Sequence, residues 1–315
     1  MSTPPTTPPL ASNRRWLLPA AFLLLGTIWG SSFLWIEITI EELPPATMTA
    51  QRLTIAAVAM LGFLLVSRPS RPTRGEIGHY AVLGLVNAGL PIFLISWGQL
   101  FVDSGTAAVL NSLTPIFSLV IAGFLLRTES WSGLRVFGVL VAFAGAIVLA
   151  SREFAFNPGA AAVIGAAAVA AGAFSYAVGA TYIRYRIQTS SRYSVAGGTL
   201  VFAALYTWVL ALAVDGAPML PTTAGAIVGV LWLGLLGSFI AYILYFFLIS
   251  YLGATVSTMV TFVFPVVGVT LGVLLLDEVL DARLLLGTGL VVLGIAMVGL
   301  RYDAVVSLAT RMARR

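Results

Sequence analysis

Residues 105–145 read GTAAVLNSLTPIFSLVIAGFLLRTESWSGLRVFGVLVAFAG, and residues 253–294 read GATVSTMVTFVFPVVGVTLGVLLLDEVLDARLLLGTGLVVLG. In each segment a proline is followed by a glutamate, and the glutamate by glycines nine and then seven residues further on. The matching positions are Pro115, Glu129, Gly138 and Gly145 in the first segment, and Pro265, Glu278, Gly287 and Gly294 in the second. This shared spacing predicts an internal repeat, and hence a chain of two related halves.

The composition of the chain indicates that lipid is its main solvent. Of the 315 residues, 59% are hydrophobic and 9% are charged, and the mean hydropathy is +1.01. An average soluble domain has about a quarter charged residues. The chain contains no cysteine, which excludes disulfides, thiolate metal sites and cysteine nucleophiles. It also lacks a GxxxxGKS/T motif, so we expect neither nucleotide hydrolysis nor a cofactor.

The apolar residues fall into runs that can be counted. A bilayer core needs about 20 apolar residues per helix. Ten runs of about this length lie near 16–37, 45–66, 77–98, 104–126, 133–150, 158–183, 193–214, 223–249, 254–276 and 283–300. We therefore predict an all-α integral membrane protein with ten transmembrane helices.

The arginines predict how these helices are oriented. All 17 basic residues are arginine, and with the N-terminus inside, fourteen of them fall on the cytoplasmic side. Only Arg152 and Arg283 fall in outside loops. Because cytoplasmic loops carry the excess of basic residues, both termini are expected in the cytoplasm. The net charge of +5 is then a topology signal, and no nucleic-acid partner is expected.

The count of ten also fixes the relation between the two halves. We expect a disordered tail at 1–15, five helices in each of the halves 16–150 and 151–302, and a basic tail at 303–315. Because five is an odd number, the second half starts from the opposite side of the membrane. Inverted repeats of this kind build two alternative gates in many secondary transporters.

Several motifs within these spans resemble the drug/metabolite transporter superfamily, specifically the bacterial ten-helix permeases of the EamA type. The residues that carry the resemblance are Trp29-Gly30-Ser31-Ser32-Phe33, Pro44-Pro45 with Arg52, Gly237-Ser238-Phe239-Ile240-Ala241-Tyr242, and the paired Pro, Glu and Gly segments. The resemblance covers roughly residues 16–300. It implies a permease of the bacterial inner membrane that exports small metabolites, such as amino acids or their analogues.

Polar and aromatic residues within the spans are the candidates for a substrate-binding pocket. Lipid cannot satisfy polar groups, so most of them should face inward. They are Trp29, Ser32, Gln51, Arg52, Asn87, Trp97, Asn111, Tyr176, Ser238, Tyr242, Tyr245 and Thr261. Each could instead serve in packing or in an interhelical hydrogen bond, but together they favour a cavity lined by aromatic rings and scattered polar groups.

Two charged residues within spans have two interpretations each. Placing a cation at the bilayer centre costs about 2.5–3.5 kcal/mol. Arg52 could therefore be the counter-charge for a substrate carboxylate, or it could bridge to backbone carbonyls or to Glu37. Glu37 could bind a coupling proton, or it could be solvated outside beside Glu41 and Glu42. The sequence does not indicate an oligomeric state.

The repeated prolines, glycines and glutamates have expected roles as well. Each of Pro115 and Pro265 removes a backbone hydrogen bond in mid-span, which predicts a hinge or a ligand-coordination point. Gly268 and Gly272 have small-xxx-small spacing, which favours close helix packing. Glu129 and Glu278 are expected to cap the free amides of the helices that they begin.

These patterns favour a secondary-active transporter for small neutral or zwitterionic substrates, because the spans hold too few cations for a polyanion. The alternatives are a channel, a permease of the same superfamily for another solute class, such as a drug, a sugar-type or a phosphorylated metabolite, and an intramembrane enzyme. An enzyme would need a constellation of acidic, histidine and serine residues at membrane depth, and none is visible in the sequence. We therefore expect no catalytic residues and no metal ligands.

Overall fold

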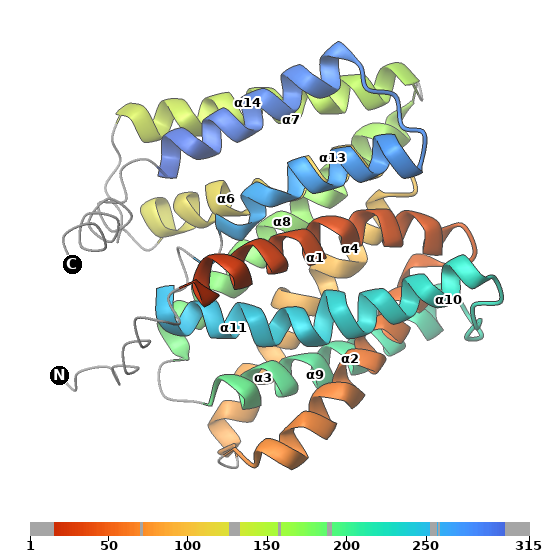
Figure 1. Ribbon diagram of the computed structural model, residues 1–315, viewed down its shortest axis with the longest axis vertical. Helices are drawn as coiled ribbons and strands as arrows, with labels where there is room; N and C mark the ends of the chain where they lie inside the picture. Colours follow the sequence, from red (N-terminus) through yellow and green to blue (C-terminus); the bar gives the residue numbers. More distant parts are fainter. Residues whose placement is uncertain are drawn as a thin grey trace.

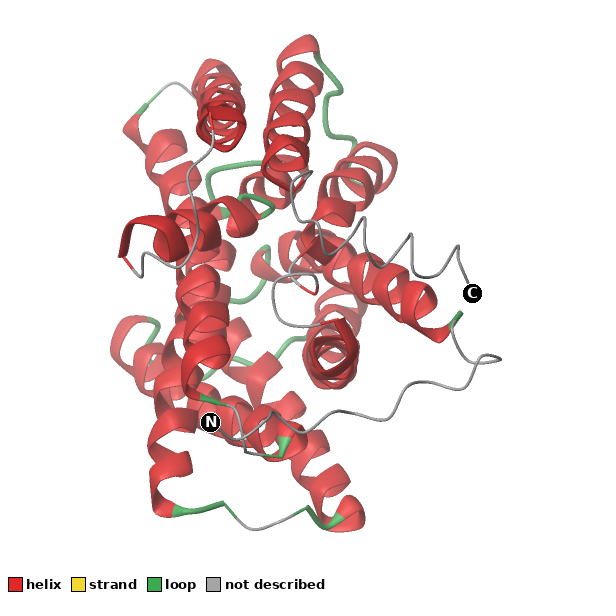
Figure 2. Cartoon of the chain, turned by 90° about the vertical axis from the view of Figure 1, so that its left-hand side faces the viewer, coloured by secondary structure: helices red, strands yellow, loops and turns green. Residues whose placement is uncertain are grey.

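The computed structural model describes residues 16–69, 72–125, 133–156, 159–187, 191–252, 257 and 259–299. In this part of the chain every regular element is helical (Figure 1, Figure 2). The first half contains α1 (Leu17–Ile40), α2 (Pro45–Ser67), α3 (Arg74–Gly84), η2 (Leu85–Gly89), α4 (Leu90–Gly98), α5 (Ser104–Asn111), α6 (Thr114–Val120), η3 (Ile121–Leu125) and α7 (Gly133–Phe156). The second contains α8 (Ala160–Arg186), α9 (Arg192–Val214), α10 (Ala224–Leu231), η4 (Trp232–Ile240), α11 (Ala241–Leu252), η5 (Met259–Phe262), α13 (Val263–Leu275) and α14 (Ala282–Gly299).

The lengths of these helices fit a membrane protein. Among the described residues, eight helical stretches are long and apolar enough to cross a membrane, and Met259–Leu275 and Ala282–Val298 are shorter apolar helices. The predicted all-α membrane class is therefore confirmed. The predicted tails at 1–15 and 303–315, like Glu129, lie outside the described residues.

The fourth predicted span is broken at its proline. Helix α5 ends at Asn111 and α6 begins at Thr114, directly before Pro115. Since proline has no N–H, the carbonyl of Asn111, four residues earlier, loses its usual backbone donor. The Thr114 hydroxyl donates to this carbonyl instead, at 2.8 Å. In the second half, the 3₁₀ helix η5 likewise precedes Pro265.

A π-helical segment, η2, interrupts the third span for a similar reason. At its end the Leu90 N–H donates to the carbonyl of Leu85, five residues earlier, so the carbonyl of Val86 loses its usual α-helical donor. Pro91 follows and has no N–H to offer to the carbonyl of Asn87. Two neighbouring carbonyls are thus released from the helix ladder and can accept hydrogen bonds from other helices.

Helices α7 and α14 lie side by side along one edge of the molecule (Figure 1). A methyl group placed on Gly138 would lie 2.8 Å from the carbonyl oxygen of Gly294, and one on Gly145 would lie 2.7 Å from that of Gly287. The two helices are therefore antiparallel, and their backbones meet at these four glycines. The first glycine of each copy of the repeated pattern contacts the second glycine of the other.

Glu278 caps a helix, although not the one predicted from the sequence. Its carboxylate accepts hydrogen bonds from the backbone N–H groups of Ser104, at 2.8 Å, and Gly105, at 3.0 Å, which begin α5. The prediction that it caps the helix following it was wrong, because Asp281 accepts from the N–H of Leu284 at the start of α14. Burial raises the pKa of Glu278, and the hydrogen bonds from Ser104 and Gly105 act in the opposite direction.

Two more carboxylates cap helices that are distant in sequence. Asp215 accepts from the backbone N–H of Thr47, at 2.7 Å, and from its hydroxyl, at 2.8 Å, in the first turn of α2. Glu42 accepts from the hydroxyls of Thr222 and Thr223, both at 2.6 Å, and from both backbone N–H groups, before the start of α10. Each carboxylate satisfies amide donors that the helix itself leaves free.

The Glu42 cap predicts a pH dependence. Hydrogen bonds from Thr222 and Thr223 lower the pKa of this exposed carboxyl from 4.5 to about 2. A lowered folded-state pKa stabilises the fold fully above pH 4.5, and this contribution disappears as the pH falls toward 2. We expect Glu42→Gln to melt below the wild type at pH 7, with a gap that closes between about pH 4.5 and pH 2. Thermal unfolding across this pH range measures the gap.

The control for this experiment is Glu41→Gln, which removes no bond to the start of α10. A gap in the Glu42→Gln series that stayed constant from pH 7 to pH 2 would show that the carboxylate does not stabilise this cap.

Arg152, near the end of α7, forms ion pairs with three carboxylates. Its Nη1 atom donates to Asp103 and to Glu153, both at 2.7 Å, and its Nε atom donates to Asp281 at 2.8 Å. Its Nη2 atom donates to the carbonyl of Val279 at 2.8 Å. The arginine side chain is 1% exposed. It is therefore a buried hub at the end of α7, and not the outside-loop residue that the sequence predicts.

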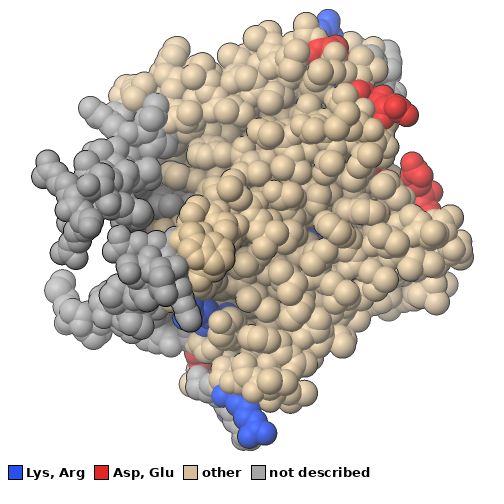
Figure 3. All heavy atoms as spheres, in the orientation of Figure 1, with Lys and Arg blue, Asp and Glu red and all other residues tan. Residues whose placement is uncertain are grey.

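The surface divides in the way that a bilayer requires. On the face shown in Figure 3, most of the visible acidic side chains lie toward the right-hand end, and a wide, almost uncharged surface covers the middle. The connection from α13 to α14 lies at that same end in Figure 1. An uncharged surface of this kind can face lipid without leaving charges unsolvated.

Candidate functional site

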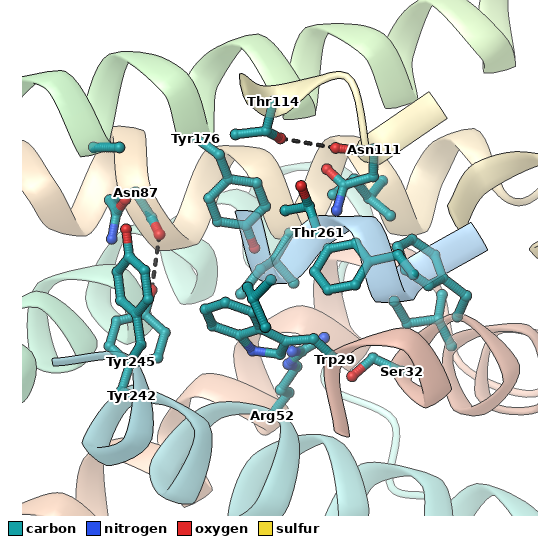
Figure 4. Close-up of a pocket in the computed structure, with 17 residues that line it drawn as sticks. Trp29, Ser32, Arg52, Asn87, Asn111, Thr114, Tyr176, Tyr242, Tyr245 and Thr261 are labelled. Carbon is teal, nitrogen blue, oxygen red and sulfur yellow. Dashed lines mark hydrogen bonds between the residues drawn. The ribbon is translucent and has the colours of Figure 1, made fainter. Parts of the chain in front are cut away.

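A cavity lies between helices that are far apart in the sequence (Figure 4). It has about 770 Å³ of empty space, including the part that opens to solvent. Its walls come from α1, α2, η2, α4, α5, α6, α8, α11, η5 and α13. The lining residues are Trp29, Ser32, Phe33, Ile36, Arg52, Asn87, Ile92, Ile95, Asn111, Thr114, Tyr176, Ala180, Tyr242, Tyr245, Val260, Thr261 and Phe264.

Nine of the twelve candidate residues from the sequence line this cavity. They are Trp29, Ser32, Arg52, Asn87, Asn111, Tyr176, Tyr242, Tyr245 and Thr261. Ser238 lies behind the wall, where its hydroxyl accepts a hydrogen bond from Arg52 Nε at 2.9 Å. The cavity therefore gathers polar and aromatic residues from both parts of the chain, as expected for groups that cannot face lipid.

The other two candidates lie elsewhere. Gln51 comes one position before the cavity-lining Arg52 in α2, and its Nε2 atom donates to the carbonyl of Met219 at 2.5 Å. Trp97 stacks edge-to-face on Phe101, with ring centroids 5.1 Å apart. Neither side chain lines the cavity. The sequence identifies that a residue is polar or aromatic within a span, but it does not fix which side of the helix faces the cavity.

Arg52 is the one charged side chain among the described residues that line the cavity. It is 4% exposed. In addition to the bond to Ser238, its Nη2 atom donates to the carbonyl of Gly237 at 3.2 Å. The structure thus shows the predicted bridge to a backbone carbonyl. No bridge to Glu37 is among the hydrogen bonds described for Arg52.

The carbonyl of Gly237 is available because of a second π-helical segment, η4. At the end of η4 the Ala241 N–H donates to the carbonyls of Leu236 and Ser238, and so bypasses Gly237. The indole Nε1 of Trp29 donates to Gly237 at 3.0 Å, beside the guanidinium of Arg52. The π segment therefore creates the acceptor that holds two cavity side chains in place.

The segment η2 performs the same task on the other side of the cavity. The hydroxyl of Ser175 donates to the released carbonyl of Val86, and the hydroxyl of Tyr242 donates to that of Asn87, both at 2.8 Å. Asn87 also packs closely against Gly179, where a methyl group would lie 2.7 Å from its Cβ. These contacts fix α8 and α11 around the polar wall.

Asn111 places a polar atom without a partner at the cavity. The residue is 5% exposed, and its Oδ1 atom has no hydrogen-bond partner among the described residues. The break between α5 and α6 directs this side chain into the cavity, where Thr261 lies close to it in Figure 4. Buried acceptors are normally satisfied, so a donor from a bound solute would complete this site.

Aromatic rings form much of the remaining wall. The ring of Trp29 lies 5.4 Å from that of Tyr245 and 6.2 Å from that of Phe264, centroid to centroid. Phe264 in turn lies 6.0 Å from Phe33. The apolar lining residues Phe33, Ile36, Ile92, Ile95, Ala180, Val260 and Phe264 were not predicted from the sequence. No signal could separate them from the many apolar residues that face lipid.

Glu37 lies one turn from the cavity residue Phe33 on α1. The Nε2 atom of Gln99 donates to its carboxylate at 2.9 Å, and also to the carbonyl of Phe33 at 3.0 Å. The carboxylate is therefore held by a neutral partner and is half-buried. Across the described residues, no group of three or more histidine, aspartate or glutamate side chains is placed to hold a metal ion.

Pro115, Pro265, Gly268 and Gly272 lie in helices that border the cavity, Pro115 in α6 and the other three in α13. Gly268 of α13 packs directly against Ala108 of α5, without room for a side chain at the glycine. Gly272 packs against the carboxylate of Glu278. Helices α5 and α13 are thus in close contact; α13 contains Pro265, and α5 ends shortly before Pro115.

Comparisons with known proteins agree with this architecture. The model of the EamA-like transporter family matches residues 17–151 and 163–300. The uncharacterized inner membrane transporter YedA of Escherichia coli (strain K12) is 31% identical, over 91% of this chain and 92% of that protein. A probable terminal-alkyne amino-acid exporter of Streptantibioticus cattleyicolor is 28% identical, over 89% of this chain and 93% of that protein.

A solved structure titled "Crystal structure of protein" has the same fold. Its TM-score is 0.65 at 21% sequence identity, and the match covers 91% of this chain and 97% of that chain. The family match includes the segments that carry the repeated pattern, all the cavity helices and the glycine-paired α7 and α14. With this coverage and a fold of apolar helices around a cavity lined by aromatic, aliphatic and a few polar side chains, the chain is a multi-pass membrane protein that belongs to the EamA-like transporter family of the drug/metabolite transporter superfamily.

Proposed function

We propose that this protein is a secondary-active transporter that exports small neutral or zwitterionic metabolites, such as amino acids or their analogues, by alternating access. The observation that carries the proposal is the cavity between the two parts of the chain, with one cation and no carboxylate among its described lining residues. A polyanion would need several cationic partners. The aromatic rings and aliphatic side chains that line the cavity suit the apolar part of a small solute.

The arrangement of helices supports two inverted halves of five helices each. Pairing of the first glycine of one copy with the second glycine of the other is the contact that a two-fold axis between α7 and α14 would produce. The irregular segments also correspond: η2 with η4 in the third and eighth spans, and the breaks before Pro115 and Pro265 in the fourth and ninth. Inverted halves can exchange conformations, and so open the cavity to one side at a time.

The same arrangement also supports an orientation of the chain in the membrane. In Figure 1, α1 begins and α14 ends on one side, opposite the connection from α13 to α14. The acidic end with Arg152 would then face outward, and both termini would lie in the cytoplasm, in accord with the arginine distribution.

The named relatives favour export of amino-acid-like solutes. One protein that is 28% identical is described as a probable terminal-alkyne amino-acid exporter, and another, 24% identical, as a probable amino-acid metabolite efflux pump of Escherichia coli (strain K12). The second candidate is a permease of the same superfamily for another solute class. Phosphorylated substrates fit this cavity less well, because its described lining holds a single cation. A channel would have no use for paired helix breaks.

Transport by the purified chain in liposomes tests the proposal. Liposomes are loaded with the twenty common amino acids, and efflux is followed by mass spectrometry at rising internal concentrations. We expect saturating efflux that Ala180→Trp abolishes by filling the cavity, whereas Ala167→Trp, on the exposed side of the same helix, leaves it unchanged. Flux that rises linearly without saturation would identify a channel, and flux that Ala180→Trp leaves intact would exclude this cavity as the route.

A further inference from the structure

We infer that Arg52 is the carboxylate-binding residue of the cavity and that Asn111 binds the amino end of the same solute. The inference rests on the proposed transport function and names the orientation of the substrate. Arg52 and Asn111 lie on opposite sides of the cavity in Figure 4, with Trp29, Tyr176 and Thr261 between them. A solute with an acidic and an amino group would connect the two poles.

The positive charge of Arg52 has no described counter-charge in the cavity. Its described partners, Ser238 and the carbonyl of Gly237, are neutral. A buried cation without a counter-charge is costly, and no carboxylate stands among the described lining residues to offset this one. A carboxylate that enters with the solute supplies the missing charge.

The guanidinium of Arg52 is held in a fixed plane by its hydrogen bonds. Hydrogen bonds from Nε and Nη2 fix the plane of the group against η4, and Trp29 shares the Gly237 acceptor. The fork is therefore already oriented before a solute binds. Arginine presents several donors in a planar fork that matches the geometry of a carboxylate.

The side chain of Asn111 presents an unsatisfied acceptor to the cavity. Its Oδ1 atom is buried and has no partner among the described residues. An ammonium or amino group offers the donor that this acceptor needs. The ring of Trp29 lies between the poles in Figure 4, and an aromatic ring there suits a nearby cation as well as an apolar side chain.

Matched pairs of solutes test this orientation. Liposomes that contain the full chain are loaded with the twenty common amino acids and their twenty α-carboxamides, and potassium with valinomycin holds the membrane potential at zero. Each amide keeps the amino group and side chain but lacks the negative charge. We expect the protein to export amino acids at least about tenfold faster than the matching amides, after subtraction of the flux from protein-free liposomes.

Variants separate binding from structural support. Arg52→Gln should lower the ratio of acid to amide flux by about tenfold or more, whereas Arg52→Lys, which keeps the charge, should retain much of the preference. Arg283→Gln removes an exposed arginine that is distant from the cavity lining and should leave the ratio unchanged. Loss of structure lowers both fluxes together and does not alter their ratio, so this readout does not depend on how much variant protein folds.

The amino end is tested in the same way. Asn111→Leu removes the acceptor with little change in size, and it should reduce export of an amino acid by about tenfold relative to its des-amino carboxylate. Equal export of acids and amides by the wild type would overturn the role of Arg52 but leave the transport function standing. Absence of export for every solute would instead overturn the proposed function, and the inference with it.

Discussion

Arg152→Ala is expected to lower the free energy of unfolding by about 3–5 kcal/mol, because it breaks a buried ion pair by removing one partner. The side chain of Arg152 is 1% exposed, and that of its neighbour Glu153 is 4% exposed. Asp103 and Asp281 are more exposed, so water screens them and they contribute little. Most of the loss therefore comes from Glu153, which stays buried without its cation.

The measurement is unfolding by SDS titration of the purified protein in micelles. Arg283→Ala is the control, because that side chain is exposed and its one side-chain hydrogen bond within the described part of the chain is a 3.3 Å bond to the carbonyl of Ser151. Adding Glu153→Gln to Arg152→Ala should recover part of the loss, since it neutralises the buried carboxylate. A loss below about 1 kcal/mol, typical of an exposed salt bridge, would contradict the picture of a buried hub.

Gly294→Val is expected to be comparably harmful, with a loss of about 3 kcal/mol or more from overpacking. A Cβ at Gly294 would lie 2.5 Å from the backbone nitrogen of Ala142 and 2.5 Å from the carbonyl oxygen of Gly138. Because both are backbone atoms, no rotamer change can make room. The helices α7 and α14 would have to separate along their whole line of contact.

Gly289 offers a matched control on the same helix, because a Cβ there would meet nothing within 4 Å. Gly289→Val and Gly294→Val therefore cost the same in backbone propensity and differ only in packing. Equal unfolding free energies for the two variants would show that α7 and α14 are not held together at the paired glycines.

The sequence predicted the helical class and most of the candidate cavity for one physical reason. Polar groups within an apolar span must find partners inside the protein, so Asn87, Asn111 and Thr261 could be assigned to the interior without a structure. Arg52 followed the same rule more strongly because of its charge. Membrane chains make this inference easier than soluble ones, where a polar residue can simply face water.

The remaining features depend on contacts that no local pattern encodes. Glu278 was correctly read as a capping residue, but the amides that it caps begin α5, which lies far away in the sequence. The π segments η2 and η4 change the rotation of the residues that follow, which helps to explain why individual cavity-facing positions were hard to predict. Gln51 and Trp97 were misplaced because adjacent positions on a helix point in different directions.

The capping carboxylates Asp215 and Glu278 have a consequence for biosynthesis. Asp215 is translated 168 residues after Thr47, whose amide it satisfies. At translation rates of about 5–20 residues per second, α2 waits roughly 10–30 s for this partner. Glu278 follows Ser104 at a comparable interval of 174 residues. The starts of α2 and α5 therefore stay uncapped until these segments of the second half have been translated, and the early half of the chain reaches its final form only together with the late half.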